Sequence, residues 1–279
     1  MEKVETMERV QDECPAPGEE SAGDEAREGH GAGDERSVSC EEAPRDAAAT
    51  LREELEARSS FYRMLKDLYF RALTQDEIDA MAQTDYTELR AGKDESLMAE
   101  GFDDIFRYLR KRNTGTRQEL AADHTGAFVG TRVIGGKQAM PYESLFRDDS
   151  GLLMRGPRTE VYRLYKQARI KLPDEVNLPE DHLAFEFEFM AILGDRAAAC
   201  LERGDWEGCD GQLSLQQEFF DGHIASWFDE FYDRALAFVR TRFYRGVLKV
   251  TKAFLDEERE TIGELRAACA LHARSARAA

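Results

Sequence analysis

The sequence has no apolar run long enough to cross a membrane, and this absence is the first limit on the class of protein. No stretch approaches the roughly 18 consecutive apolar residues of a membrane-spanning helix. The first residues, MEKVETMERVQDE, contain no apolar segment of the kind that a secretion signal needs. With 42% hydrophobic residues, the 279-residue chain can still build an ordinary packed core. We therefore expect a cytoplasmic protein without stable membrane insertion.

Cysteine is also scarce, with five residues scattered over positions 14, 40, 200, 209 and 269. No two of them form a Cys-x-x-Cys pair, so the spacing opposes both a disulfide scaffold and a zinc ribbon. Cys200 and Cys209 could approach each other around the turn at Gly204 to Gly208, but ordinary thiols are the simpler interpretation. The sequence assigns no chemistry to the cysteines.

Basic residues are outnumbered, with 38 against 56 acidic residues and a formal net charge of −18. A charge of this sign repels nucleic acid and anionic membrane surfaces, so basic partners are favoured. The first 48 residues carry 15 acidic and 5 basic side chains. Residues 1–47 also contain no aromatic residue, and such a segment buries too little apolar surface to offset the entropy lost on ordering. We predict a disordered acidic tail over residues 1–47.

Beyond residue 47, apolar side chains recur at helical spacing. A long first helix is predicted from about Ala48, and Thr74 with Glu77 forms a capping-box signature for a short helix through Met81. No run alternates with a period of two, so the predicted class is an all-α, single globular helical bundle. Further helices are predicted around 102–109, from Thr116 with Glu119, over 158–169, from Pro179, from Ser214 with Gln217, and over 243–255 and 262–271.

A glycine-rich segment at about 129–157, which contains Pro141 and Pro157, interrupts this helical pattern. We interpret it as a long functional loop between two helical halves. The predicted helical domain therefore spans 48–272, and residues 273–279 are expected to be disordered.

The segment Leu178 to Met190, LPEDHLAFEFEFM, is the most conspicuous run in the chain. Proline suits a first helical turn, and Asp181 is expected to cap the helix. His182 and Glu186 lie one turn apart on an apolar face, which predicts that they satisfy each other or a neighbouring helix. A metal site is a weaker interpretation, because di-metal bundles use paired Glu-x-x-His motifs and the chain has none.

The stretch GTRVIGGK, Gly130 to Lys137, resembles a phosphate-binding loop but has an extra glycine and lacks the Ser or Thr that binds magnesium. A flexible hinge is the favoured interpretation. A helical metal- or nucleotide-dependent enzyme remains an alternative, supported only by this loop and by His182 with Glu186. We predict no catalytic residues, no metal and no cofactor.

Four segments in order resemble the TorD/DmsD/NarJ family of redox-enzyme maturation chaperones. They are DHTGAFVG (123–130), PYESLF (141–146), PEDHLAFEFEFM (179–190) and HIASWFDEF (223–231), and the resemblance covers about residues 48–258. It implies an all-α fold, no catalytic turnover, and binding in the cytoplasm to the twin-arginine leader and apo-protein of a molybdenum oxidoreductase. The implied signal-peptide-binding residues are Asp181, His182, Phe128, Pro141 and Tyr142, with Ser144 and Glu186 as further candidates.

From this resemblance we hypothesise that Asp181, with Glu180 or Glu186, pairs with leader arginines, while Phe128 and Tyr142 receive the apolar part of the leader. An assembly factor for a reductase subunit without a cleavable leader is a second interpretation. The sequence leaves open whether the chain is a monomer or a domain-swapped dimer.

Overall fold

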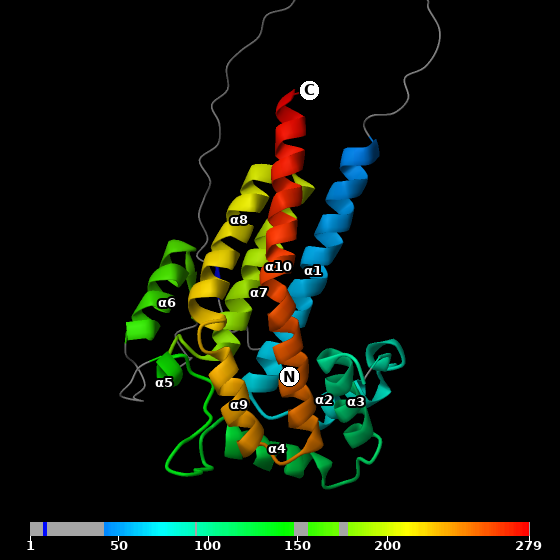
Figure 1. Ribbon diagram of the computed structural model, residues 1–279, viewed down its shortest axis with the longest axis vertical. Helices are drawn as coiled ribbons and strands as arrows, with labels where there is room; N and C mark the ends of the chain where they lie inside the picture. The colour runs from blue at the N-terminus through cyan, green and yellow to red at the C-terminus, as the bar shows by residue number, and fades with distance from the viewer. Residues whose placement is uncertain (1–7, 10–41, 93, 148–155, 173–177, 279) are drawn as a thin grey trace, which may run out of the picture.

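The computed structural model describes residues 8–9, 42–92, 94–147, 156–172 and 178–278. Within these residues the chain is almost entirely helical, which confirms the predicted all-α class. Figure 1 shows long helices side by side, with shorter helices gathered at their lower end. The long helices are α1 (Glu42–Phe70), α7 (Leu183–Glu202), α8 (Trp206–Phe219) and α10 (Arg242–Ala278).

Helix α7 is the centre of the bundle. All residues from Leu183 to Gly194 are buried, and α1 and α8 both pack against this helix. A helix that is apolar all round has no face for solvent, so its position inside the bundle follows from its composition. Two carboxylates, those of Glu186 and Glu188, are buried with it. Among the described residues, no helix is long and apolar enough to span a bilayer.

The shorter helices pack around one end of the bundle. Helix α3 lies across α10, and two glycines permit the close crossing. A Cβ added at Gly101 would lie 2.8 Å from the Gly246 carbonyl oxygen, and one at Gly246 would lie 2.5 Å from that of Gly101. The elements of this end are α2 (Gln75–Gln83), the 3₁₀ turn η1 (Glu88–Arg90), α3 (Leu97–Leu109), α4 (Thr116–Ala127) and α9 (Phe228–Phe238).

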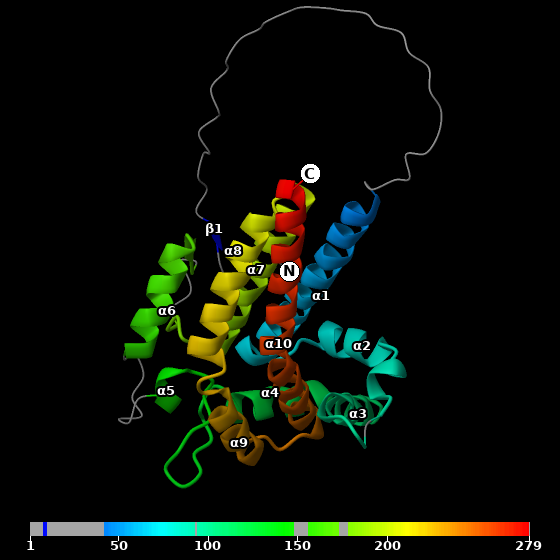
Figure 2. The same ribbon diagram turned by 45° about the horizontal axis from the view of Figure 1, so that its top comes forward.

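A flank of the molecule is formed by α5 (Ser144–Arg147), α6 (Gly156–Gln167) and a two-residue strand β2 (Ile170–Lys171), as Figure 2 shows. Strand β2 pairs antiparallel with β1 (Glu8–Arg9). Residues 8–9 of the predicted disordered tail are therefore in a strand, while residues 1–7 and 10–41 lie outside the described residues. The predicted loop at 129–157 contains α5, and α6 begins at Gly156.

Several predicted helix boundaries need correction. The capping box of Thr74 and Glu77 is confirmed, and α1 begins at Glu42, earlier than predicted. Thr116 does not cap α4, because Gly115 is the N-cap residue and the Thr116 hydroxyl accepts from the Asn113 N–H. Ser214 lies inside α8. The two predicted C-terminal helices are one helix, α10, which continues to Ala278, so residues 273–278 are helical rather than disordered.

Candidate functional site

His182, rather than Asp181, caps the central helix. The His182 Nδ1 atom accepts from the Ala184 N–H at 3.0 Å, and helix α7 starts only at Leu183. Pro179 therefore precedes the helix instead of standing in its first turn. Asp181 points elsewhere, and its Oδ2 accepts from the Ser144 N–H at 2.9 Å. The side chains of His182 and Glu186 also do not pair: among the described residues only the backbone joins them, where the Glu186 N–H donates to the His182 carbonyl at 3.1 Å, and both carboxyl oxygens of Glu186 lack a partner.

The segment 141–146 is joined to the start of α7 by backbone hydrogen bonds. The Leu183 N–H donates to the Pro141 carbonyl at 2.9 Å, and the Glu143 N–H donates to the Asp181 carbonyl at 3.0 Å. The Tyr142 and His182 rings meet edge to face with centroids 4.8 Å apart. Two of the four sequence segments thus form one structural unit, which brings together Pro141, Tyr142, Ser144, Asp181 and His182.

Three carboxyl groups at this unit have no solvent exposure: those of Glu143 and Asp181, and that of Glu186 in α7. We call them the acid cluster. Burial raises the pKa of the Glu186 carboxyl well above its usual value, and the charges of Glu143 and Asp181 raise it further. Burial also raises the pKa of Asp181, although hydrogen bonding by Ser144 lowers it. Carboxyl groups placed so closely in a dry environment cannot all ionise at low cost.

Within the acid cluster, Glu143 is the carboxyl group that contacts basic side chains. Glu143 contacts His223 Nδ1 at 3.0 Å and accepts from Arg147 Nη1 at 2.5 Å. His223 stands in a π-helical segment, Phe220–Ile224, that joins α8 to the turn before α9. Such segments are uncommon and are frequently found at functional sites. His223 and Glu143 were not predicted as site residues, although both lie inside the quoted sequence segments.

Several buried polar atoms around the acid cluster have no hydrogen-bond partner. They are Asp181 Oδ1, both carboxyl oxygens of Glu186, Ser144 Oγ and Trp227 Nε1. The Trp227 indole faces Glu186 closely enough to lower its pKa, yet it does not reach hydrogen-bonding geometry. Buried polar atoms are nearly always paired, so an unpaired group of this size is unusual. The acid cluster therefore has spare acceptor capacity for a ligand rich in N–H donors.

Phe128 does not join this site. Its ring packs among those of Tyr69, His124 and Tyr244, with centroids 5.2–5.5 Å away. The neighbouring Asp123 accepts from the Thr241 N–H at 2.7 Å and thereby ties α4 to the start of α10. Asp123 and Phe128 of the segment 123–130 are thus packed into the core, and every predicted signal-peptide-binding residue is buried in this state.

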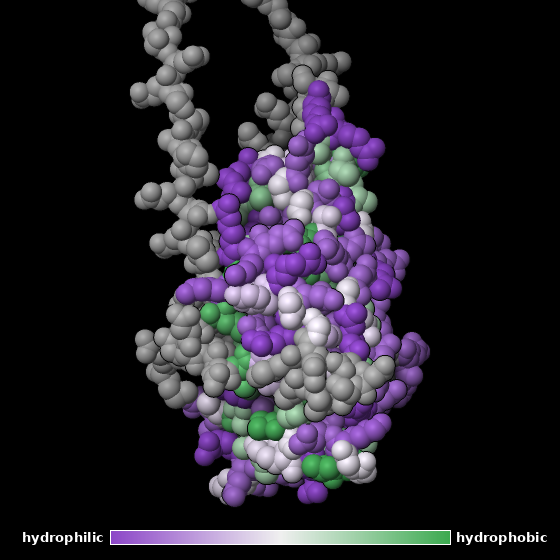
Figure 3. Space-filling view, turned by 90° about the vertical axis from the view of Figure 1, so that its left-hand side faces the viewer, coloured by the Kyte–Doolittle hydropathy of each residue, from purple (hydrophilic) through white to green (hydrophobic). Residues whose placement is uncertain are grey.

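Exposed apolar side chains lie just beyond Phe128, on the turn at 129–138. Val129, Val133 and Ile134 are each about half exposed, while the face in Figure 3 is largely hydrophilic with scattered apolar patches. Ile134 and Lys137 form an antiparallel bridge across Gly135 and Gly136, both of which have positive φ. Because no helix follows until Ser144, this glycine-rich stretch is a tight turn and not a phosphate-binding loop.

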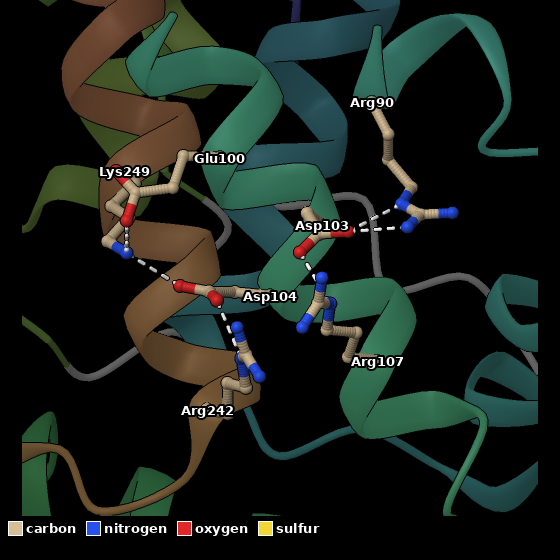
Figure 4. A network of polar contacts seen from close by, with 7 residues as sticks. All are labelled: Arg90, Glu100, Asp103, Asp104, Arg107, Arg242 and Lys249. Atoms are coloured by element: carbon tan, nitrogen blue, oxygen red, sulfur yellow. Dashed lines mark hydrogen bonds and ion pairs between the residues drawn. The ribbon is translucent and has the colours of Figure 1, made fainter. Parts of the chain in front are cut away.

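A second concentration of charge joins α3 to α10 but is internally paired. Asp103 contacts Arg90 and Arg107, and Asp104 contacts Arg242 Nε and Lys249 Nζ, each at 2.6 Å (Figure 4). A surface cavity of about 270 Å³ beside it is lined by the cations of Arg107, Lys111 and Arg242 and by one carboxylate, that of Glu119, so positive charge predominates. This sign of charge would repel an arginine-containing ligand. In the described part of the chain, no group of three or more His, Cys, Asp or Glu side chains could hold a metal ion.

Comparison with known proteins finds a family match that contains all four sequence segments. A family model described as nitrate reductase delta subunit matches residues 91–233, just over half of the chain. The chain is similar to the Chaperone protein TorD of Vibrio cholerae serotype O1, with 26% identity over 213 residues that cover 75% of this chain and 94% of that protein. It is also similar to the protein of the same name from Vibrio parahaemolyticus serotype O3:K6, with 27% identity over 203 residues, 71% of this chain and 91% of that protein.

Proposed function

The chain belongs to the nitrate reductase delta subunit family, the TorD/DmsD/NarJ type that its four segments resemble, and on this basis we propose that it is a chaperone rather than an enzyme. The relatives that match most of its length carry the name Chaperone protein TorD, which supports the proposal. Its client would be a molybdenum oxidoreductase that is held in the cytoplasm in its apo form until the cofactor is inserted.

The acid cluster is the proposed binding site for the arginines of the client's twin-arginine leader. The observation that carries this proposal is the set of unpaired buried oxygens on Asp181 and Glu186. A guanidinium group presents five N–H donors in a planar fork and matches carboxylates in charge and geometry. Arg147 of the chain itself already places one such guanidinium against Glu143, so the cluster accepts this chemistry.

Access requires the segment 141–147 to move away from α7. The bonds to be broken are the backbone hydrogen bonds of Pro141, Glu143 and Ser144, the Glu143–His223 contact at 3.0 Å, and the bond from Arg147 to the Gly222 carbonyl at 2.9 Å. The Phe146 ring, which stacks on Trp227 with centroids 5.3 Å apart, would also have to separate from it. Local openings of this size are drawn from the least stable part of a fold. On opening, Tyr142 and the exposed turn at 129–138 are the groups that we propose to receive the apolar part of the leader.

Calorimetric titration of a twin-arginine leader peptide tests the proposal. A charge-assisted hydrogen bond to arginine is worth roughly 1.5 to 3 kcal/mol, so Asp181→Asn should weaken binding about tenfold to a hundredfold. Glu186→Gln and His182→Ala are the companion variants, and Asp104→Asn is the matched control because Asp104 is a buried acid outside the cluster. A leader with two lysines in place of the arginines controls for charge alone. Equal affinities for folded variants would remove the acid cluster from the binding site.

A second candidate is an assembly factor for a reductase subunit that has no cleavable leader. The matching family is described as nitrate reductase delta subunit, which favours this function. The two functions differ in one measurement: the assembly factor would bind the apo-subunit in pull-down experiments but would not bind the isolated leader peptide in the titration above.

A further inference from the structure

A second small apolar cluster lies where α8 and the C-terminal half of α10 run side by side (Figures 1 and 2). Cys209 of α8 and Cys269 of α10 both lie in it with no solvent exposure, and their sulfur atoms are 3.2 Å apart. We propose that Cys209 and Cys269 form a disulfide that clamps α10 to α8 when the protein meets a small-molecule disulfide oxidant. Nothing in the proposed chaperone function requires this bond.

The contacts on either side of the two cysteines hold them in register. One turn before Cys209, the Trp206 ring stacks on His272 with centroids 4.4 Å apart. One turn after it, Leu213 shares the apolar cluster with Leu265. These pairs run antiparallel with helical spacing on both helices, so the two sulfur atoms meet because the whole interface places them there.

An ion pair fixes the same interface from its rim. Arg266 Nε donates to Asp210 at 2.9 Å, and Arg266 Nη1 donates to Gln217 at 2.7 Å. Separation of the cysteines would require α8 and α10 to slide past each other and to break these contacts. A disulfide bond is about 2.05 Å long, so its formation needs an approach of only about 1.2 Å from the present distance.

The two thiols are not equivalent. A hydrogen bond joins them at 3.2 Å, and it lowers the pKa of the Cys269 thiol while raising that of Cys209, so Cys269 is the first of the two to lose its proton. Cys269 is therefore the better nucleophile, because the thiolate is the reactive form. It also lies near the end of α10, where fraying of the last turns would admit a small oxidant. The Cys200 sulfur accepts from Arg203 Nη2 at 3.5 Å, and among the described cysteines no hydrogen bond joins it to Cys209 or Cys269.

The reaction is a balanced thiol–disulfide exchange with glutathione disulfide. The Cys269 thiolate attacks one sulfur of the oxidant, forms a mixed disulfide and releases one glutathione thiolate. Cys209 then loses its proton and attacks the Cys269 sulfur, which forms the protein disulfide and releases the second glutathione. Two protein thiols are oxidised, one disulfide is reduced, and the two protons end on the released thiols.

The bond would close a loop of 60 residues, since the two cysteines are 60 positions apart. That loop contains His223 and Trp227, which face the acid cluster. Closure of a loop of this length restricts the unfolded chain strongly, and a disulfide of ordinary geometry should raise the melting temperature by about 4–16 °C.

The test equilibrates the folded full-length chain in glutathione buffers of increasing oxidising strength, followed by alkylation and peptide mapping without reduction. We expect the loss of two alkylatable thiols, a peptide that joins Cys209 to Cys269, and the rise in melting temperature. Cys209→Ser and Cys269→Ser should abolish the bond, and Cys200→Ser is the matched control that should keep it. The proposal is overturned if both thiols remain alkylatable in the most oxidising buffer, or if the crosslink appears only after denaturation.

Discussion

Replacement of His182 by asparagine would separate its two roles at the start of α7. Asparagine is a strong N-cap residue, so it can keep the bond to the Ala184 N–H, but it does not titrate. In the folded chain, burial and, to a smaller extent, the neighbouring His124 lower the pKa of His182 from its ordinary value of 6.5 to about 3. Below pH 6.5 the unfolded chain therefore binds a proton that the folded chain does not.

The sign and size of the effect follow from this difference. Above pH 6.5 the neutral His182 does not lower the free energy of unfolding. As the pH falls from 6.5 toward 3, the free energy of unfolding decreases by about 1.4 kcal/mol per pH unit. Between pH 7.5 and 4.5 the wild type should thus lose about 2.7 kcal/mol more than His182→Asn. The measurement is urea unfolding at four pH values from 7.5 to 4.5.

Two comparisons make this reading specific. His124, whose pKa is lowered to about 4 chiefly by burial, is present in both proteins, so the difference between their curves isolates His182. His182→Ala should add the loss of the cap, about 0.5–2 kcal/mol at every pH. Parallel curves for wild type and His182→Asn would refute the assignment of a neutral buried imidazole.

Other predictions follow from the buried charges. Glu186→Gln should stabilise the protein increasingly as the pH rises, by about 1.4 kcal/mol per pH unit above the ordinary carboxyl pKa, because the raised pKa makes ionisation unfavourable in the folded state; unfolding at pH 5 and 8 measures it. Arg58→Met should cost about 3–5 kcal/mol in urea unfolding, because it leaves Glu258 buried with only the Tyr62 hydroxyl at 2.5 Å. The exposed ion pair of Arg52 with Glu202 is the matched control, and Arg52→Met should cost less than about 1 kcal/mol.

The sequence predicted those parts of the fold that depend on local spacing. The capping box of Thr74 and Glu77 is a contact over three residues, and it forms as expected. Ser214 with Gln217 has a similar pattern but lies inside α8. Tertiary packing decides whether such a pair stands at the start of a helix or within it. The break predicted between 255 and 262 is absent because Glu258 in that charged stretch is buried against Arg58, 200 positions away. No local pattern carries that pairing.

The candidate site divides in the same way. Resemblance identified Asp181, His182, Tyr142 and Ser144, and the structure brings them together. The sequence does not predict Glu143 as a site residue, because its partner His223 is 80 positions away and no local pattern links the two residues. A signal for them is present in the sequence: both are titratable residues inside the four quoted segments, and Glu143 stands between the predicted Tyr142 and Ser144.

The closed site and a cation-binding role are consistent with each other on energetic grounds. A carboxyl group whose pKa is raised by burial is protonated at a cost that grows with pH, so at neutral pH the acid cluster destabilises the closed arrangement of segment 141–147. On the proposed opening, Asp181 and Glu186 would ionise, and an entering guanidinium would meet charged acceptors instead of neutral ones. Binding of a ligand that carries positive charge and N–H donors would relieve the unfavourable burial of these carboxyl groups, and an uncharged ligand would not. On the proposed function, the acid cluster would thus favour a client with arginines over an equally apolar segment without them.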